Sequence, residues 1–297
     1  MPLCIILTLL AAATQTLRFA LQKRLGGGTL TPAGATFARF LFAAPLALAA
    51  AGVTLAMTGG IAAPSPAFWG FVLMGGVAQI LATELTVTLF QMRNFAVGVA
   101  FTKTEVVQTA LFSLAVLGEV LGIAGLVAVA FGLAGVLLLT LHPAKGAPLG
   151  QPALIGVLSG ALFAVASVGF RGATLELGTA PYGLRAIVAL AAATAIQTAL
   201  MALWLTFRQP GEVGRVLSAW RATAPVGLAG LAGSYFWFAA FAMERAAYVR
   251  ALGQIEVVFS LAVSALIFRE RLGRREAAGV ALIFAATMVL ILSSRSV

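Results

Sequence analysis

Ionisable side chains stand inside several long apolar stretches of this chain, where a charge needs either a partner or water. Burying a charged side chain in a bilayer costs at least about 2.5–3.5 kcal/mol, so such residues usually have a function. Four of the seven are cations and three are carboxylates, a mixture that could bind a charged solute or carry a proton. They are Arg18, Arg39, Glu84, Lys103, Glu105, Arg185 and Glu256.

Two of these carboxylates belong to an internal repeat with an offset of 151 residues. The tripeptide Glu-Val-Val at 105–107 recurs at 256–258, and the register continues without a gap from Trp69/Trp220 to Leu139/Leu290. Duplication combined with buried charge in an apolar chain is typical of a secondary transporter.

Polar residues near the repeated carboxylates have helical spacing. Thr109 and Ser113 follow Glu105 at four and eight residues, which places all three on one helix face. The same spacing recurs after Glu256, and Gln15, Arg18 and Gln22 also share one helix face. Such faces could line a hydrated interior, or they could only form hydrogen bonds between helices. Lys103 and Glu105 are two residues apart, so a regular helix would point them to nearly opposite sides.

The repeat is chemically asymmetric, because charged or polar residues of the first copy are replaced in the second. Gln254 stands in place of Lys103, and Tyr235 in place of Glu84. The second copy is richer in aromatic side chains, including Trp237. The positions where the repeat fails are therefore where we expect the substrate.

The composition indicates a membrane protein. Of 297 residues 61% are hydrophobic and 9% are charged, and the mean hydropathy is +1.05. A soluble domain would carry roughly 25% charged residues. The apolar runs have about the length that a bilayer core requires, and they lack the alternation of a β-barrel. We therefore expect an all-α membrane protein.

Charge and composition also narrow the function classes. The net charge is +10, but the basic residues lie mostly at span ends, where anionic lipid head groups are the expected partners, not nucleic acid. One cysteine, one histidine and no aspartate argue against a disulfide, a metal centre or a lipid-processing enzyme. We expect no catalytic residue and no cofactor.

Hydropathy predicts ten spans, five in each half of the chain. An odd number per half forces the second half to lie upside down, so the repeat is predicted to be inverted. We divide the chain into a first five-helix repeat (1–142), a linker (143–150) and a second repeat (151–297). The spans are 3–22, 33–52, 67–90, 95–117, 121–141, 151–172, 182–206, 222–242, 248–268 and 275–293.

The charges of the loops predict an orientation. Eleven basic residues fall on the side of the 1–2, 3–4, 5–6, 7–8 and 9–10 connections, against four on the other side, namely Arg171, Arg245, Arg250 and Arg295. By the positive-inside rule the first side is cytoplasmic and both termini are outside.

Two carboxylates lie in short turns between predicted spans. Glu119 and Glu270 are each followed by a glycine three residues on, Gly122 and Gly273. A carboxylate at a helix N-terminus interacts favourably with the helix dipole and free amides, so we expect a structural role.

These turns also carry a family resemblance. Residues 117–122 with 132–139, and 268–273 with 279–283, resemble the ends of two tandem EamA repeats of the drug/metabolite transporter superfamily. Arg39 matches an arginine common early in the second span. The resemblance implies ten helices around a central cavity, and usually export of small metabolites such as amino acids. It also implies cytoplasmic termini, in conflict with the loop charges.

The leading hypothesis is an inner-membrane secondary transporter that works by alternating access and binds substrate near the bilayer midplane. The cationic excess of the predicted interior suits a small carboxylate-bearing metabolite. Glu105 and Glu84 are the candidates for a proton carrier, because burial favours the neutral carboxyl. The predicted cavity residues are Gln15, Arg18, Arg39, Gln79, Glu84, Lys103, Glu105, Gln108, Arg185, Tyr235, Trp237, Gln254 and Glu256.

Alternatives stay open at this stage. One is an exchanger or uniporter for nucleobase-like or drug-like solutes, and another is a structural or receptor-like membrane subunit without transport. The oligomeric state is not determined by the sequence, and a monomer is compatible with it.

Overall fold

The computed structural model describes residues 2–26, 30–92, 95–120, 122–140, 150–269 and the positions 278–279, 281–282, 284–285 and 288. Every element within these ranges is a helix, as the composition predicts. In chain order the elements are α1 (Pro2–Gly26), α2 (Pro32–Thr58), α3 (Pro66–Met92), α4 (Phe95–Phe101), η1 (Thr102–Thr104), α5 (Glu105–Leu117), α6 (Ile123–Thr140), α7 (Gly150–Glu176), α8 (Tyr182–Arg208), α9 (Glu212–Ser218), α10 (Trp220–Met243), α11 (Ala246–Leu252), η2 (Gly253–Ile255) and α12 (Glu256–Leu266).

Eight helical segments in the described part of the chain are long and apolar enough to cross a membrane. A helix of 20 residues spans about 30 Å, the thickness of a bilayer core. They match eight of the ten predicted spans. The predicted span 121–141 corresponds to α6, an apolar helix of 18 residues. The predicted span 275–293 lies mostly outside the described residues, so the count of ten stays a prediction.

The fourth and ninth predicted spans are not regular α-helices over their whole length. A single 3₁₀ turn interrupts each of them, η1 after α4 and η2 after α11. Both turns, and the carboxylates Glu105 and Glu256 that begin the next helices, are related by the repeat offset of 151. The 3₁₀ turn is tighter than an α-helix and commonly marks a functional hinge, so the duplication has preserved a local feature of the backbone.

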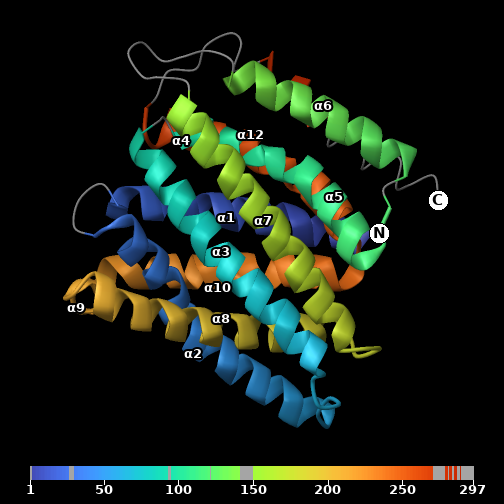
Figure 1. Cartoon of the computed structure of the whole chain (residues 1–297), viewed down its shortest axis with the longest axis vertical. Coiled ribbons are helices and arrows are strands. Elements are labelled where there is room, and N and C mark those ends of the chain that lie inside the picture. Colours follow the sequence, from blue (N-terminus) through green and yellow to red (C-terminus); the bar gives the residue numbers. More distant parts are fainter. Residues whose placement is uncertain are drawn as a thin grey trace.

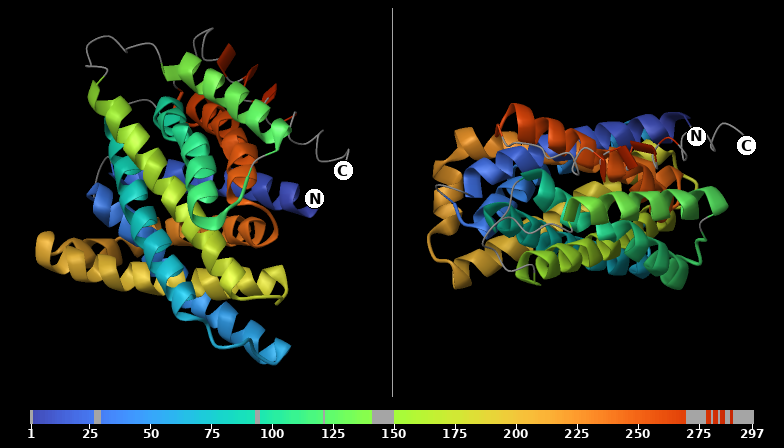
Figure 2. Two further views of the ribbon diagram at one scale, coloured as in Figure 1. Left: turned by 45° about the vertical axis from the view of Figure 1, so that its right-hand side comes forward. Right: turned by 90° about the horizontal axis from the view of Figure 1, so that it is seen from above.

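The helices pack in pairs that join the two halves (Figures 1 and 2). Helices α3 and α7 run side by side, α1 packs against α10, and α2 packs against α8. By the repeat offset α1 corresponds to α7, α2 to α8 and α3 to α10. The α1–α10 pair is therefore equivalent to the α7–α3 pair under the repeat. The α2–α8 pair is equivalent to itself.

Glycines allow the closest of these approaches. A Cβ on Gly169 of α7 would lie 2.8 Å from the backbone of Gly75 in α3, so a larger residue cannot stand there without moving a helix. On the α1–α10 side, a Cβ on Gly233 would lie 2.9 Å from the hydroxyl oxygen of Thr14.

Helix α9 is hydrogen-bonded to the residue that precedes α2. The Glu212 carboxylate accepts hydrogen bonds from the Thr31 backbone N–H at 2.7 Å and from the Thr31 hydroxyl at 2.9 Å. Arg215 Nε donates to its other oxygen at 2.6 Å. Burial disfavours the charged carboxylate, but these hydrogen bonds outweigh burial and hold the pKa of Glu212 below its ordinary value.

Candidate functional site

Four charged side chains meet where the two broken helices approach each other. Lys103 Nζ of η1 lies 2.6 Å from Glu256 Oε2, the first residue of α12, and 3.3 Å from Glu105 Oε1, the first residue of α5. Arg250 of α11 places Nη1 3.7 Å from the same Glu105 oxygen. All four side chains are buried, so each break supplies one cation and one carboxylate to a shared cluster.

Uncharged partners extend this cluster into α1, α7 and α10. Gln15 Nε2 donates to Glu256 Oε2 at 2.9 Å, and Trp237 Nε1 donates to Gln15 Oε1 at 2.9 Å. Arg250 donates to Ser167 Oγ at 2.6 Å, and its guanidinium lies 4.5 Å from the Trp237 ring centroid. Three of the sequence-predicted cavity residues, Gln15, Trp237 and Glu256, are thus joined by one hydrogen-bond chain.

A second pair of cations lies in the core near this chain. Arg18 follows Gln15 by one helical turn of α1 and donates to Gln22, and Arg39 of α2 donates to the hydroxyls of Thr83 and Ser234 at 3.1 and 3.0 Å. The two arginines are 1% and 2% exposed. Both approach Gly230 of α10, where a Cβ would lie 2.9 Å from Arg39 and 3.4 Å from Arg18.

The buried charges of this region do not balance. Within the described ranges neither Arg18 nor Arg39 forms an ion pair, and Nη2 of Arg18 is buried without a hydrogen-bond partner. Lys103 and Arg250 are matched by Glu105 and Glu256, so the two arginines leave an excess of positive charge. A buried charge without a partner is costly, and an anion that enters the core would remove that cost.

The prediction that Lys103 and Glu105 point to opposite sides is wrong. Their charged groups are 3.3 Å apart. The 3₁₀ turn η1 changes the path of the backbone between them, so the spacing of a regular helix does not apply.

Arg171 and Arg250, counted among the charges of the minority side, lie within helices. Arg250 is buried in α11, and Arg171 lies within α7, where its Nε donates to Glu119 Oε1 at 2.8 Å. The position of Arg250 inside the predicted span 248–268 is the signal that could have identified it as a site residue.

Two predicted cavity glutamines serve helix packing. Gln79 of α3 accepts from Nε2 of Gln197 in α8 at 2.9 Å, and the same amide donates to the Gly76 carbonyl at 3.1 Å. Gln108 of α5 reaches the Val157 carbonyl of α7 at 3.5 Å. These contacts are hydrogen bonds between helices, the alternative to a hydrated cavity. Gln197 was not among the predicted residues.

Arg185 and Tyr235 lie away from the charge cluster. Arg185, in the first turn of α8, donates to the backbone carbonyls of Ala242 at 2.9 Å and Thr174 at 3.5 Å, near the ends of α10 and α7. A cation placed on helix C-terminal carbonyls stabilises the helix ends. Tyr235 lines a separate groove between α2, α8 and α10.

Gln254, the counterpart of Lys103, is buried in η2. Its amide packs against Gly132 of α6, and its Nε2 has no hydrogen-bond partner among the described residues. Oε1 of Glu256 likewise has none. Hydrogen-bonding capacity is therefore left over in the second break.

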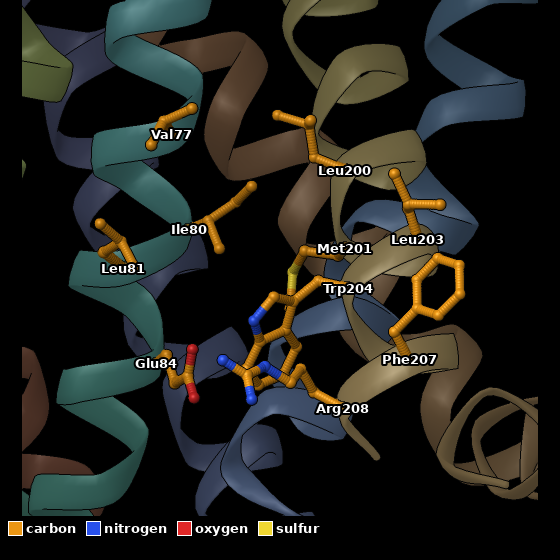
Figure 3. A pocket seen from close by; sticks show the side chains of 10 residues that line it. All are labelled: Val77, Ile80, Leu81, Glu84, Leu200, Met201, Leu203, Trp204, Phe207 and Arg208. Carbon is orange, nitrogen blue, oxygen red and sulfur yellow. The ribbon is translucent and has the colours of Figure 1, made fainter. Parts of the chain in front are cut away.

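Glu84 was predicted to line the central cavity, but it lies outside the buried charge cluster. It is half-buried and lines a side pocket between α3 and α8 together with Arg208 and apolar side chains (Figure 3). It takes no part in the ion pairs of Lys103.

The turn residues act at helix starts, as far as the described residues reach. Glu119 accepts from Ser113 Oγ at 2.8 Å and from the Ala246 backbone N–H at 3.2 Å, so it interacts with the first residue of α11 and not with the helix that follows it. Gly122 supplies the carbonyl that accepts from Leu126 at 3.1 Å at the start of α6. Glu270 and Gly273 lie outside the described residues.

The comparisons with known proteins bear on the family and the fold. None of the curated proteins matches the chain. Among solved structures, a crystal structure with 20% sequence identity covers 99% of this chain and 97% of its own, with a TM-score of 0.68. At that identity the likeness establishes the fold only.

The family comparison matches the second half of the chain. Residues 152–292, which include most of the second predicted repeat, match the EamA-like transporter family. The long apolar helices of the described residues indicate a multi-pass membrane protein, and the match indicates an EamA-like transporter domain in its second half. The resemblance predicted from the sequence is confirmed, and the chain carries an EamA-like transporter domain.

Proposed function

We propose that the chain is a secondary transporter that moves small carboxylate-bearing metabolites, amino acids first among them, out of the cell across the inner membrane. The observation that carries the proposal is the excess of buried positive charge at Arg18 and Arg39 next to a balanced cluster of two cations and two carboxylates. A fixed cationic excess in a low-dielectric core favours an anionic solute.

The chemistry of the neighbouring groups fits an amino acid. The substrate carboxylate would lie on the guanidinium groups of Arg18 and Arg39, which form charge-assisted hydrogen bonds with such an anion. A substrate ammonium would face the Glu256 carboxylate, one of whose oxygens is unpaired among the described residues. Gln15, three residues from Arg18 and bonded to Glu256, would connect the two subsites.

Alternating access would come from the two broken helices. We infer an inverted pair of five-helix halves, ten spans in all, on the support of the shared offset of the breaks and the exchange of helix pairs between halves. Substrate sites of such transporters form at discontinuous helices near the bilayer midplane. Movement of one half against the other would open the cluster first to one side and then to the other.

Proton coupling would use Glu105. Its carboxylate faces both Lys103 and Arg250, whereas Glu84 lines a side pocket. Protonation of Glu105 would weaken both ion pairs, so that binding of a proton and rearrangement of the two breaks would be linked.

Transport in proteoliposomes tests the substrate class. Purified protein should exchange labelled amino acids, and Arg39→Gln should lower the rate at least about tenfold, the loss expected for one charge-assisted hydrogen bond. Arg221→Gln, at an exposed position early in α10, is the matched control and should keep the wild-type rate. A wild-type protein that moves no carboxylate-bearing solute would refute the proposal.

A separate measurement tests the proton carrier. Uptake driven by a pH gradient should disappear in Glu105→Gln, while exchange without a gradient should continue in the same vesicles. Full gradient-driven uptake by this variant would exclude Glu105.

A further inference from the structure

The side pocket between α3 and α8 has an apolar wall and one charged end. It has a volume of about 570 Å³, and Figure 3 shows Val77 and Leu200 at one end of it and Glu84 and Arg208 at the other. The side chains between are apolar, and Trp204 lies beside the two charged groups. Several wall residues face outward, with Leu203 59% and Phe207 75% exposed.

The two charged groups of the pocket do not form an ion pair with each other. In the described part of the chain neither Glu84 nor Arg208 forms an ion pair. They nevertheless lie at the same end of the pocket, one contributed by α3 and one by α8. A carboxylate and a guanidinium that stay apart present one acceptor group and one donor group to a third molecule.

The position along the helices places this end near the membrane surface. Arg208 is the last residue of α8, and Glu84 precedes the end of α3 by eight residues, or about 12 Å at 1.5 Å per residue. Tryptophan is enriched at the same depth, where its ring meets head groups. The apolar wall then continues toward the bilayer centre, where acyl chains lie.

We propose that this pocket binds one zwitterionic phospholipid with a primary ammonium in its head group. The ammonium donates to the Glu84 carboxylate, the phosphate accepts from the Arg208 guanidinium, and an acyl chain lies along Val77, Leu81 and Leu203. The charge pattern selects this occupant. An anionic lipid would meet the Glu84 carboxylate, a lipophilic cation would meet Arg208, and a choline head group has no N–H to donate.

Trp204 provides the readout. Lipids brominated on the acyl chain quench a tryptophan that they touch, and the difference between wild type and Trp204→Phe isolates the signal of this residue. In detergent micelles with graded amounts of brominated lipid, half-maximal quenching should need about tenfold less phosphatidylethanolamine than phosphatidylcholine, the ratio that one charge-assisted hydrogen bond supplies.

Variants assign the preference to the two charges. Glu84→Gln should make the two lipids equal, and Arg208→Gln should weaken both. Glu176→Gln and Arg221→Gln, exposed charges outside the pocket, are the controls and should keep the preference. Because the readout is binding to folded protein, it does not depend on the proposed transport.

Three results would overturn the proposal. The first is equal quenching by both lipids in the wild type, and the second is a preference that survives Glu84→Gln. The third is displacement of the brominated lipid by tetraphenylphosphonium in a manner that depends on Glu84 and not on Arg208, which would identify the pocket as a site for lipophilic cations.

Discussion

The two helix breaks have the same backbone and different chemistry. In the first, η1 carries Lys103, whose ammonium contacts both Glu105 and Glu256. In the second, η2 carries Gln254 at the equivalent position, and its amide nitrogen is unpaired among the described residues. The duplicated scaffold has thus kept both 3₁₀ turns, whereas a single cation, Lys103, contacts the carboxylates of both.

This difference indicates that the breaks are coupled electrostatically and not only by symmetry. Lys103 of the first half forms an ion pair with Glu256 of the second half. The two breaks therefore cannot separate without exposing a charge to solvent or leaving it buried and unpaired. In a buried setting that penalty is several kcal/mol, large enough to hold the two breaks together.

The largest expected effect comes from making the first break like the second. Lys103→Gln removes the cation between two carboxylates that stay buried, and removing one member of a buried ion pair costs about 3–5 kcal/mol. We expect a melting temperature lowered by more than 5 °C in detergent, measured by thermal unfolding.

A double variant separates lost charge from lost packing. In Lys103→Gln with Glu256→Gln no carboxylate is stranded at the second break, so much of the stability should return, and the two substitutions should be strongly non-additive. A Lys103→Gln protein as stable as the wild type would show that the ion pair is not what joins the breaks.

A smaller effect should distinguish how tightly each break is enclosed. A Cβ at Gly160 would lie 2.8 Å from the Thr102 carbonyl and 3.1 Å from the Glu105 backbone nitrogen, so Gly160→Ala must move the first break and should cost about 1–3 kcal/mol. At Gly132 the three atoms nearest to the added methyl all belong to the end of the Gln254 side chain, which can rotate.

The comparison of these two variants is read as a difference in melting temperature. Gly132→Ala should lie within about 1 kcal/mol of the wild type, because a gain in helix propensity offsets part of the crowding. Gly70→Ala, where nothing lies within 4 Å of the new methyl, is the control for propensity alone. Equal losses of stability in Gly160→Ala and Gly132→Ala would contradict the inference that the first break is the more tightly enclosed one.

The sequence predicts the helical membrane fold because hydropathy and span length are sums over many residues, and errors at single positions cancel. It also predicts the buried carboxylates Glu105 and Glu256, since a charge inside a repeated apolar segment is conspicuous. It does not predict the contact of Lys103 with Glu105. That contact depends on a single 3₁₀ turn, which has no signal in the periodicity.

The failures at other positions have the same physical origin. Glu84 and Lys103 look alike in the sequence, because both are charges inside apolar runs, yet one lines a side pocket and the other the core. Which face of a helix meets lipid is decided by its neighbours, and α3 shows no dominant apolar stripe from which the face could be inferred. Arg250 was missed because its position near the end of a span resembles that of a lipid-facing cation.

The smallest expected effect concerns a third difference between the halves, the loop before the third helix of each. In the second half this loop contains α9 with the buried Glu212, whereas the equivalent loop 59–65 of the first half contains no helix. Glu212→Gln keeps the shape of the side chain but weakens its hydrogen bonds from Thr31 and Arg215, and should lower stability by about 1 kcal/mol at pH 7.

The sign of the pH dependence follows from the lowered pKa of Glu212. A carboxylate whose pKa is lower folded than unfolded contributes stability above its unfolded pKa of about 4.3, and that stability is lost as the pH falls through the folded value. The gap in melting temperature between wild type and Glu212→Gln should therefore be full at pH 7 and close below about pH 4. A gap that is the same at pH 7 and pH 4 would mean that the charge of Glu212 does not stabilise the contact between α9 and α2.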